Sequence, residues 1–228
     1  MQPLELYIHI PFCVKKCAYC DFLSGPAGEK EKEEYVKMLV DEIRKCPDTV
    51  QNYRVISIFF GGGTPSLLTG EQIGRLMDTV REIFTLDEDA EITMEMNPGT
   101  VTEEKLRKYR QAGVNRLSIG LQSVNDEELR LLGRIHTYEE FLEAYHLARA
   151  NGFANINVDL ISAIPGQTVE SWRRTLEQVM ALSPEHISAY SLILEEGTTF
   201  YKKYVDEILR VKPHTLMRSV RCTGIRKR

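Results

Sequence analysis

The chain has 228 residues, 43% of them hydrophobic and 27% charged, which is ordinary for a globular protein and enough for one large α/β domain with its own core. It has no run of about 20 apolar residues that could span a membrane, and its first residues lack the basic and apolar segments of a signal peptide. Five cysteines, an odd number, argue against a secreted disulfide framework, so we expect a cytoplasmic protein with reduced thiols.

The net charge of −4 is spread unevenly along the chain. Residues 201–228 contain nine lysines or arginines against two acidic residues, a charge of +7 that leaves −11 on the first 200 residues. A basic segment of this kind can bind nucleic acid or an anionic membrane surface. We expect neither, because the regular pattern of the preceding residues stops near Tyr201 and the tail shows no convincing periodicity.

The first 200 residues alternate between β-rich runs and amphipathic helical patterns. Strands are predicted at 4–10, 55–60, 90–97, 114–121, 156–161 and 186–194. Helices are predicted at 29–46, 71–84, 103–112, 126–132, 138–150 and 169–182. Thr69, Thr102 and Thr137 have the spacing of helix-start residues, and Gly113 and Gly152 that of helix-end residues.

Strict alternation of this kind predicts an α/β fold with parallel strands inside and helices outside. Six units fit a partial (β/α)6 barrel better than a closed eight-stranded one. We therefore expect one core domain over residues 1–200 and an irregular basic tail over 201–228.

In such a fold the carboxyl ends of the strands form the active site. A cysteine-rich loop follows the first strand and a glycine run follows the second. Glu95 and Asn97 end the third strand, Gln122 follows the fourth, and Asp159 lies on the fifth. Polar residues at the ends of separate strands predict one polar pocket.

Cys13, Cys17 and Cys20 lie on one short loop with the spacing C-x3-C-x2-C and no obvious fourth cysteine. Three thiolates can hold an iron–sulfur cluster that keeps one iron open to a small ligand. The alternative is a zinc site with His9 as a fourth ligand. Structural zinc sites usually combine two pairs of ligands, and a second pair is missing here, so the cluster is the favoured interpretation.

The remaining polar groups allow both functional and structural interpretations. The glycines at 61–63 let backbone amides approach a ligand, although such runs are often only tight turns. Glu95 and Asp159 can accept hydrogen bonds from an amine or a ribose diol, or they can be solvated ends of strands. Arg134 can pair with a ligand carboxylate or lie on the surface. His136 is expected to be exposed, and we assign it no role.

Together these residues resemble the radical S-adenosylmethionine superfamily, and within it the group of oxygen-independent coproporphyrinogen III oxidase and the radical-SAM heme chaperones. The likeness covers residues 7–199. It rests on six motifs in order, His9-Ile-Pro-Phe-Cys13, Cys17-Ala-Tyr-Cys20, Phe60-Gly-Gly-Gly-Thr-Pro65, Glu95-Met-Asn-Pro98, Gly120-Leu-Gln-Ser123 and Asn157-Val-Asp-Leu-Ile161.

The resemblance implies that Cys13, Cys17 and Cys20 hold a 4Fe-4S iron–sulfur cluster. It also implies that S-adenosylmethionine binds the open iron through its amino and carboxylate groups and is cleaved reductively when the cluster is reduced, for example by flavodoxin or ferredoxin. The residues that would line its site are Tyr7, Tyr19, Gly62, Gly63, Thr64, Glu95, Gln122, Arg134 and Asp159.

Two departures from the oxidase pattern favour the chaperone branch, which binds heme as cargo and hands it to apo-hemoproteins. The oxidase carries a further cysteine where Phe22 stands here, and it has a long extension before the residue that corresponds to Tyr7. The oxidase, which decarboxylates the propionates of coproporphyrinogen III, remains the alternative. Whether the protein is an enzyme is therefore left open.

A third departure concerns the length of the chain. The family continues into a further domain that helps to enclose the porphyrin, whereas the pattern here stops near Tyr201. We expect a truncated gene product with a tail that is read out of frame. A zinc-stabilised nucleic-acid binder is the least favoured reading, so heme and hemoproteins are the expected partners and nucleic acid is not.

Overall fold

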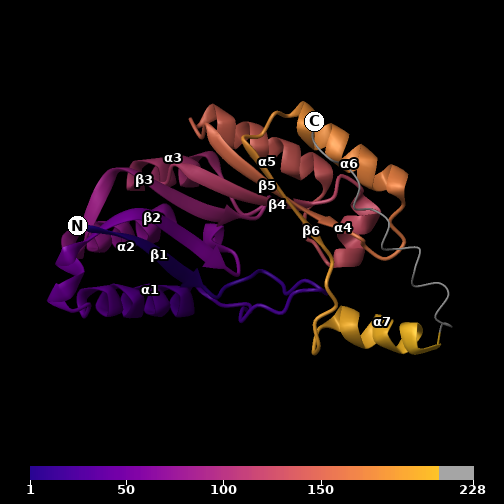
Figure 1. Ribbon diagram of the computed structural model, residues 1–228, viewed down its shortest axis with the longest axis horizontal. Helices are drawn as coiled ribbons and strands as arrows, with labels where there is room; N and C mark the ends of the chain where they lie inside the picture. Colours follow the sequence, from indigo (N-terminus) through magenta and orange to yellow (C-terminus); the bar gives the residue numbers. More distant parts are fainter. Residues whose placement is uncertain (211–228) are drawn as a thin grey trace.

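Six parallel strands form one curved sheet in which the order of the strands in space is their order in the sequence (Figure 1). The computed structural model describes residues 1–210. The strands are β1 (Gln2–Ile10), β2 (Tyr53–Gly62), β3 (Thr85–Met96), β4 (Arg116–Gln122), β5 (Asn155–Ser162) and β6 (His186–Ser191). The predicted partial (β/α)6 barrel is confirmed.

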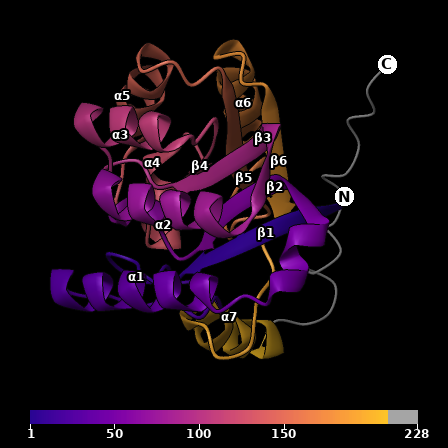
Figure 2. The same cartoon turned by 90° about the vertical axis from the view of Figure 1, so that its left-hand side faces the viewer.

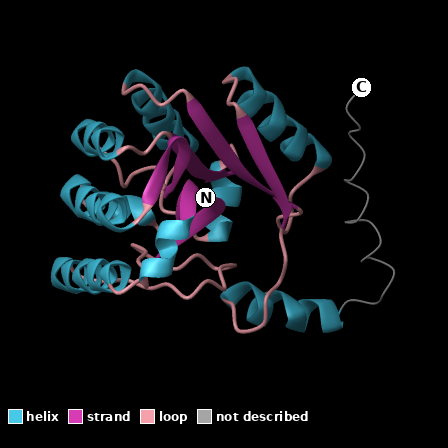
Figure 3. Ribbon diagram, turned by 60° about the vertical axis from the view of Figure 1, so that its left-hand side comes forward, coloured by secondary structure: helices cyan, strands magenta, loops and turns pink. Residues whose placement is uncertain are grey.

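Helices cover the outer face of this sheet, as the views along its edge show (Figures 2 and 3). Neighbouring helices α1, α2 and α3 pack against one another. The α-helices are α1 (Glu29–Arg44), α2 (Gly70–Ile83), α3 (Glu103–Ala112), α4 (Asp126–Leu132), α5 (Tyr138–Ala150), α6 (Val169–Ala181) and α7 (Thr199–Arg210). Two short 3-10 helices, Asp48–Asn52 and Pro65–Leu67, complete the described elements.

The core lies between the sheet and the helices because apolar side chains alternate along the strands. On β5, Ile156, Val158 and Leu160 are fully buried toward the helices, and the polar Asn157 and Asp159 point to the inner face. Purely parallel sheets are usually apolar on both faces. A polar inner face therefore marks the concave side of this sheet as the place for a polar ligand.

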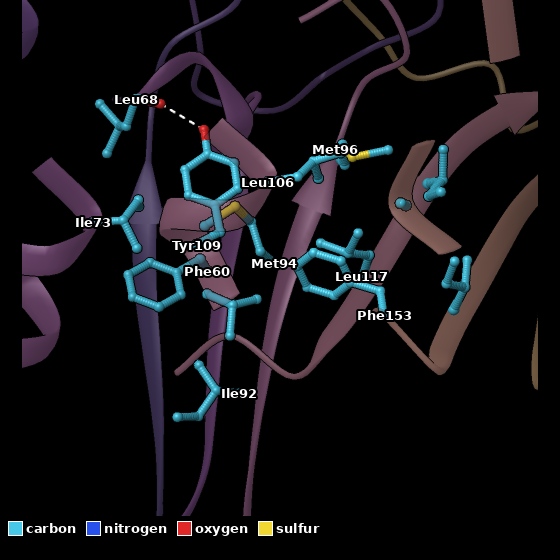
Figure 4. Packing of buried hydrophobic residues seen from close by; sticks show 14 of the residues in the cluster. Phe60, Leu68, Ile73, Ile92, Met94, Met96, Leu106, Tyr109, Leu117 and Phe153 are labelled. Atoms are coloured by element: carbon cyan, nitrogen blue, oxygen red, sulfur yellow. Dashed lines mark hydrogen bonds between the residues drawn. The ribbon is translucent and has the colours of Figure 1, made fainter. Parts of the chain in front are cut away.

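The helices contribute their apolar stripes to the same core. On α2, Ile73, Leu76, Met77 and Val80 have the spacing of one helix face and are completely buried. Figure 4 shows Ile73 beside side chains of the neighbouring strands and Tyr109 of α3, whose hydroxyl donates a hydrogen bond to the Leu68 carbonyl at 2.6 Å. This bond satisfies a buried polar group and ties α3 to the loop after β2.

The predicted helix boundaries follow from capping residues. The Thr69 and Thr137 side chains each accept a hydrogen bond from the backbone three residues on, in reciprocal capping boxes, and Thr102 also caps its helix. Gly113 ends α3 with φ of 104°, and Gly152 has φ of 83° just after α5.

The bounds of the elements differ most from the sequence-based expectation at three elements, and the other ends agree within two residues. β3 begins at Thr85 instead of residue 90, because Thr85 and Leu86 pair with β2 before a register shift skips the acidic residues that follow. β6 ends at Ser191 instead of residue 194. Helix α7 begins at Thr199, where an irregular tail was expected, and the rest of that tail, residues 211–228, lies outside the described residues.

Within residues 1–210, no helix is long and apolar enough to cross a membrane.

Two glycine-to-alanine changes test this account of the helices. Gly113→Ala should lower the free energy of unfolding by about 1–3 kcal/mol, because a side chain is strained at positive φ and its Cβ would lie 2.6 Å from the Arg81 guanidinium. Gly74→Ala, inside α2 with nothing within 4 Å, should raise it by about 0.5–1 kcal/mol. Urea unfolding of both variants measures the difference, and equal midpoints would contradict the assignment.

Candidate functional site

The cysteine loop after β1 has almost no secondary structure and is held by backbone hydrogen bonds to distant segments. The Cys13 N–H donates to the Gly25 carbonyl at 2.9 Å, which closes the loop at its base. At its far side, the Ala18 N–H donates to the Leu132 carbonyl at 3.0 Å, and the Ala18 carbonyl accepts from the Phe200 N–H at 2.9 Å. The loop is thus fastened to the end of α4 and the start of α7.

The three thiols of this loop are unpaired and half-buried. The Thr64 hydroxyl donates to Cys13 Sγ at 3.7 Å, and the Arg134 guanidinium donates to Cys17 Sγ at 3.7 Å. Burial raises the pKa of the Cys20 thiol above its ordinary value. Donors aimed at sulfur stabilise a thiolate and tune any metal that it binds.

One cavity of about 590 Å³ unites the carboxyl ends of the strands with this loop. Eleven of the twelve predicted site residues line it. They are Cys13, Cys17, Cys20, Tyr19, Gly62, Gly63, Thr64, Glu95, Gln122, Arg134 and Asp159. The sequence predicted one polar pocket from the ends of separate strands, and these eleven residues do line one cavity.

Tyr7 is the predicted site residue that does not line this cavity. Its side chain is 60% exposed on β1 and its hydroxyl lies 3.2 Å from His9 Nδ1. His9 Nε2 in turn lies 3.3 Å from the Leu23 carbonyl. Both ring nitrogens of His9 thus have hydrogen-bond partners in this structure.

The glycine run at the end of β2 allows close approach of neighbouring segments. The Gly62 N–H donates to Glu95 Oε2 at 2.9 Å, and the Gly63 N–H donates to the Ile10 carbonyl at 2.8 Å. Gly62 has φ of 115°, and a Cβ there would lie 2.5 Å from the His9 ring. A Cβ at Gly63 would lie 2.5 Å from the Phe12 carbonyl. These two positions therefore require glycine.

The two strand carboxylates that line the cavity, Glu95 and Asp159, sit in different surroundings. Glu95 has one donor, Gly62, and burial together with the nearby Asp159 charge raises the pKa of Glu95 to about 7. Asp159 accepts from the Ser118 hydroxyl and the Asn157 amide, each at 2.8 Å. Burial also raises the pKa of Asp159, against the effect of these donors. Two hydrogen bonds therefore hold the Asp159 carboxylate in place, whereas the surroundings of Glu95 make it the more readily protonated of the two.

Arg134 crosses the cavity from the loop after α4. It donates to the Gly120 carbonyl at 2.7 Å and to Asn97 Oδ1 at 3.2 Å, in addition to Cys17. Burial raises the pKa of the neighbouring Tyr19 hydroxyl, which Arg134 opposes. Arg134 is therefore an interior cation and not a surface charge.

His136 was expected to be exposed, and this expectation is wrong. Its ring is only 4% exposed, and its Nε2 lies 3.3 Å from the Leu121 carbonyl. Burial, and then the Arg134 charge, lower the pKa of His136 to about 3, so the ring is neutral at physiological pH. The residues next to His136 in the sequence do not indicate that its loop packs against the end of β4.

Further residues line the cavity that sequence reasoning did not assign to the site. Ser118 and Gly120 share the inner face of β4 with Gln122, so period-two alternation could have identified them. Others lie on the cysteine loop, at the ends of β3, β5 and β6, or just after β6. They are Lys15, Asp21, Phe22, Met96, Ile161, Tyr190, Ser191, Leu192, Ile193 and Glu195. Asn97, which the sequence placed at the end of the third strand, also lines the cavity.

Among the described residues, no group of three or more His, Cys, Asp or Glu side chains converges as the ligands of one metal ion would. Ligands of a cluster with several iron and sulfur atoms surround a larger object than a single ion. The three cysteines, spread along the wall of one cavity, fit the chemistry of such a cluster through their thiol donors and the Thr64 and Arg134 donors beside them.

Comparison with known proteins defines the class. The model of the radical SAM superfamily matches residues 7–179. Coproporphyrinogen III oxidase (HemN) from Escherichia coli superposes on 92% of this chain and 53% of its own, with a TM-score of 0.78 and 31% identity. The methyltransferase TsrM from Kitasatospora setae shares the fold at a TM-score of 0.64 and 16% identity, over 91% of this chain and 38% of its own. The chain belongs to the radical SAM superfamily, whose cofactors are a 4Fe-4S cluster and S-adenosylmethionine.

Within this class the sequence is similar to named heme chaperones. Heme chaperone HemW from Escherichia coli (strain K12) is 46% identical over 201 residues, which are 88% of this chain and 53% of the relative. Radical S-adenosyl methionine domain-containing protein 1, mitochondrial, from Danio rerio is 38% identical over 199 residues, 87% of this chain and 45% of the relative. The chain thus spans about half the length of the curated relatives it matches.

The environment of Glu95 predicts a pH dependence of stability. The raised pKa of Glu95 means that the folded chain binds this proton more tightly than the unfolded chain. Protonated Glu95 therefore contributes its full stabilisation below the ordinary pKa of a glutamate, and this contribution is lost as the pH rises toward 7. Between pH 5 and 8 the free energy of unfolding of the iron-free chain should fall by on the order of 1–3 kcal/mol more than that of the Glu95→Gln variant. Urea unfolding at each pH measures this difference, and parallel curves for the two proteins would refute the assignment.

Proposed function

We propose that the protein is a heme chaperone of the radical SAM superfamily that binds a 4Fe-4S cluster, S-adenosylmethionine and heme, and hands heme to apo-hemoproteins. The observation that carries the proposal is the convergence of three free thiols with the strand-end carboxylates and Arg134 on one cavity. The names of the relatives support the heme chaperone branch. Cysteine ligands must stay reduced, so the proposed setting is the cytoplasm.

The cysteines would be the ligands of the cluster. Cys13, Cys17 and Cys20 supply three thiolates, one fewer than the four irons, which leaves one iron for a ligand that enters the cavity. Thr64 and Arg134 would hydrogen bond to the ligating sulfurs and withdraw electron density from them. When it is bound and reduced, the cluster supplies the electron for reductive cleavage of S-adenosylmethionine.

The charge of the cavity suits S-adenosylmethionine, which carries a sulfonium and an ammonium group. Four acidic residues line the cavity against two basic ones. They are Asp21, Glu95, Asp159 and Glu195, against Lys15 and Arg134. The fixed oxygens of Asp159 would accept from a ribose diol, Glu95 from an amine or a hydroxyl, and Arg134 would pair with a carboxylate.

Phe22 supports the chaperone over the oxidase alternative. It stands where the oxidase has a further cysteine, and it lines the cavity next to the cluster ligands. The structural likeness to HemN keeps coproporphyrinogen oxidation as the second candidate. An external electron donor such as flavodoxin or ferredoxin belongs to either function and is also part of the proposal.

Anaerobic reconstitution with iron and sulfide tests the cluster site. The protein should take up about four irons and show a broad absorption near ~400 nm, and S-adenosylmethionine should perturb the electron paramagnetic resonance of its reduced form. Cys13→Ala should lose the cluster, whereas Cys46→Ala should keep it, because Cys46 lies beyond α1 with its thiol near the Glu42 carbonyl. Equal iron content in both variants would contradict the assignment.

Heme titration and transfer test the function itself. Addition of heme should give a sharp Soret band, and the band should move to apo-myoglobin when this acceptor is added. Bovine serum albumin loaded with heme serves as a control for passive release. Turnover of coproporphyrinogen III with a reductant, without heme transfer, would favour the oxidase instead.

A further inference from the structure

The end of β4 carries backbone strain at a residue of the cavity. Gln122 has φ of 76°, in the left-handed region that residues with a side chain rarely adopt. The register of β4 with β5 passes from Gly120–Asp159 to Gln122–Leu160 and skips Leu121, which is the mark of a β-bulge. Strain of this kind persists only where the surroundings enforce it.

Gln122 lies on the inner face of β4, and its side chain packs against Gly120. A Cβ at Gly120 would lie 3.0 Å from Gln122 Nε2 and 3.1 Å from Arg134 Nη2. Gln122 is 8% exposed and lines the cavity beside both groups. A change of φ at Gln122 would move this side chain from its present position, because φ sets the direction of the Cα–Cβ bond relative to the preceding strand.

His136 contacts the backbone carbonyl of Leu121, the residue that the register of β4 with β5 skips. Because a carbonyl oxygen only accepts, the His136 Nε2 that lies 3.3 Å from the Leu121 carbonyl carries the proton. The opposite nitrogen, Nδ1, is buried and has no partner among the described residues. The neutral ring therefore has one N–H donor, and this N–H donates to the carbonyl of Leu121, the residue before Gln122.

The neighbouring residues of the bulge are held in the same way. Arg134 donates to the Gly120 carbonyl at 2.7 Å on one side. On the other side the Ser123 hydroxyl, completely buried, donates to Glu128 Oε2 at 2.6 Å. Gln167 also donates to this carboxylate, at 2.8 Å. Each residue that flanks the strained position thus has a side-chain partner from outside the sheet.

We infer that His136 is a positioning residue that holds Gln122 in its left-handed conformation and so shapes the S-adenosylmethionine site. The inference rests on the proposed function for its ligand, although not for its structural part. His136 acts through the backbone of Leu121 and not by contact with a ligand, since it does not line the cavity.

A double-mutant cycle tests this inference. In reconstituted protein, His136→Leu should weaken S-adenosylmethionine binding about tenfold with unchanged iron content, because the released strand end relaxes toward an unstrained conformation. Gln122→Gly removes the side chain and also the strain, since glycine adopts positive φ freely. On this background His136→Leu should have little further effect on affinity. Independent, additive effects would overturn the inference.

Two control variants separate positioning from general stability. His136→Gln keeps an amide N–H at about the reach of Nε2 and should restore most of the affinity. Tyr145→Phe removes the buried hydroxyl that donates to the Leu182 carbonyl at 3.0 Å. Neither residue lines the cavity, so this change should lower stability without changing affinity. If Tyr145→Phe weakens binding as much as His136→Leu, the role of His136 is only structural.

Unfolding of the iron-free proteins provides a readout that needs no cofactor. His136→Leu should lower the urea midpoint more in the otherwise wild-type chain than in the Gln122→Gly variant, because only glutamine is strained at this position. If the wild type fails to bind S-adenosylmethionine, the proposed function fails while this measurement still tests the role of His136. Equal losses on both backgrounds would overturn it.

Discussion

All six strands run parallel and lie side by side in their order along the chain, and the rest of the structure depends on this arrangement. It brings every carboxyl end of a strand to one edge of the sheet, so that residues far apart in sequence meet without any long loop. It also fixes which face of each strand meets a helix. Alternate residues then have only two environments, an apolar outer core and a polar inner surface, and the cavity forms where that inner surface meets the cysteine loop.

The inner surface carries a connected polar network below the cavity. The side-chain amide of Asn157 donates to Asp159 and Ser118. Its side-chain oxygen Oδ1 accepts from the Ser188 hydroxyl and lies 2.5 Å from His186 Nδ1. Buried polar groups stabilise a unique arrangement only when each has its partner, and in this network they do. The position of the Asp159 carboxylate is therefore set by three strands, β4, β5 and β6, and not by its own rotamer alone.

The sequence predicts much of this site because its signals are local. The cysteine spacing, the glycine run and the strand ends are read from a few neighbouring residues each, and the alternation of strands and helices then places them at one edge. What it does not predict depends on distant contacts. The burial of His136 arises from the fold of its loop under β4, and the early start of β3 arises from pairing of Thr85 with β2. Tyr7, assigned from the family pattern, lies outside the cavity lining in this structure. Helix α7 was not predicted because the basic residues within its sequence obscured the helical spacing of the apolar ones.

The two hydrogen bonds of Ala18 set an order of events for the chain. One partner, Leu132, is more than a hundred residues away in sequence, and the other, Phe200, lies at the start of the last described helix. The ribosome delivers the N-terminus first, and contacts of such large sequence separation form late. The cysteine segment is made among the first residues, and its local bond from Cys13 to Gly25 can form early, but the two bonds of Ala18 require Leu132 and Phe200 to have been synthesised. A chain cut before Phe200 would therefore lack one of the two hydrogen bonds that fasten the far side of the cysteine loop.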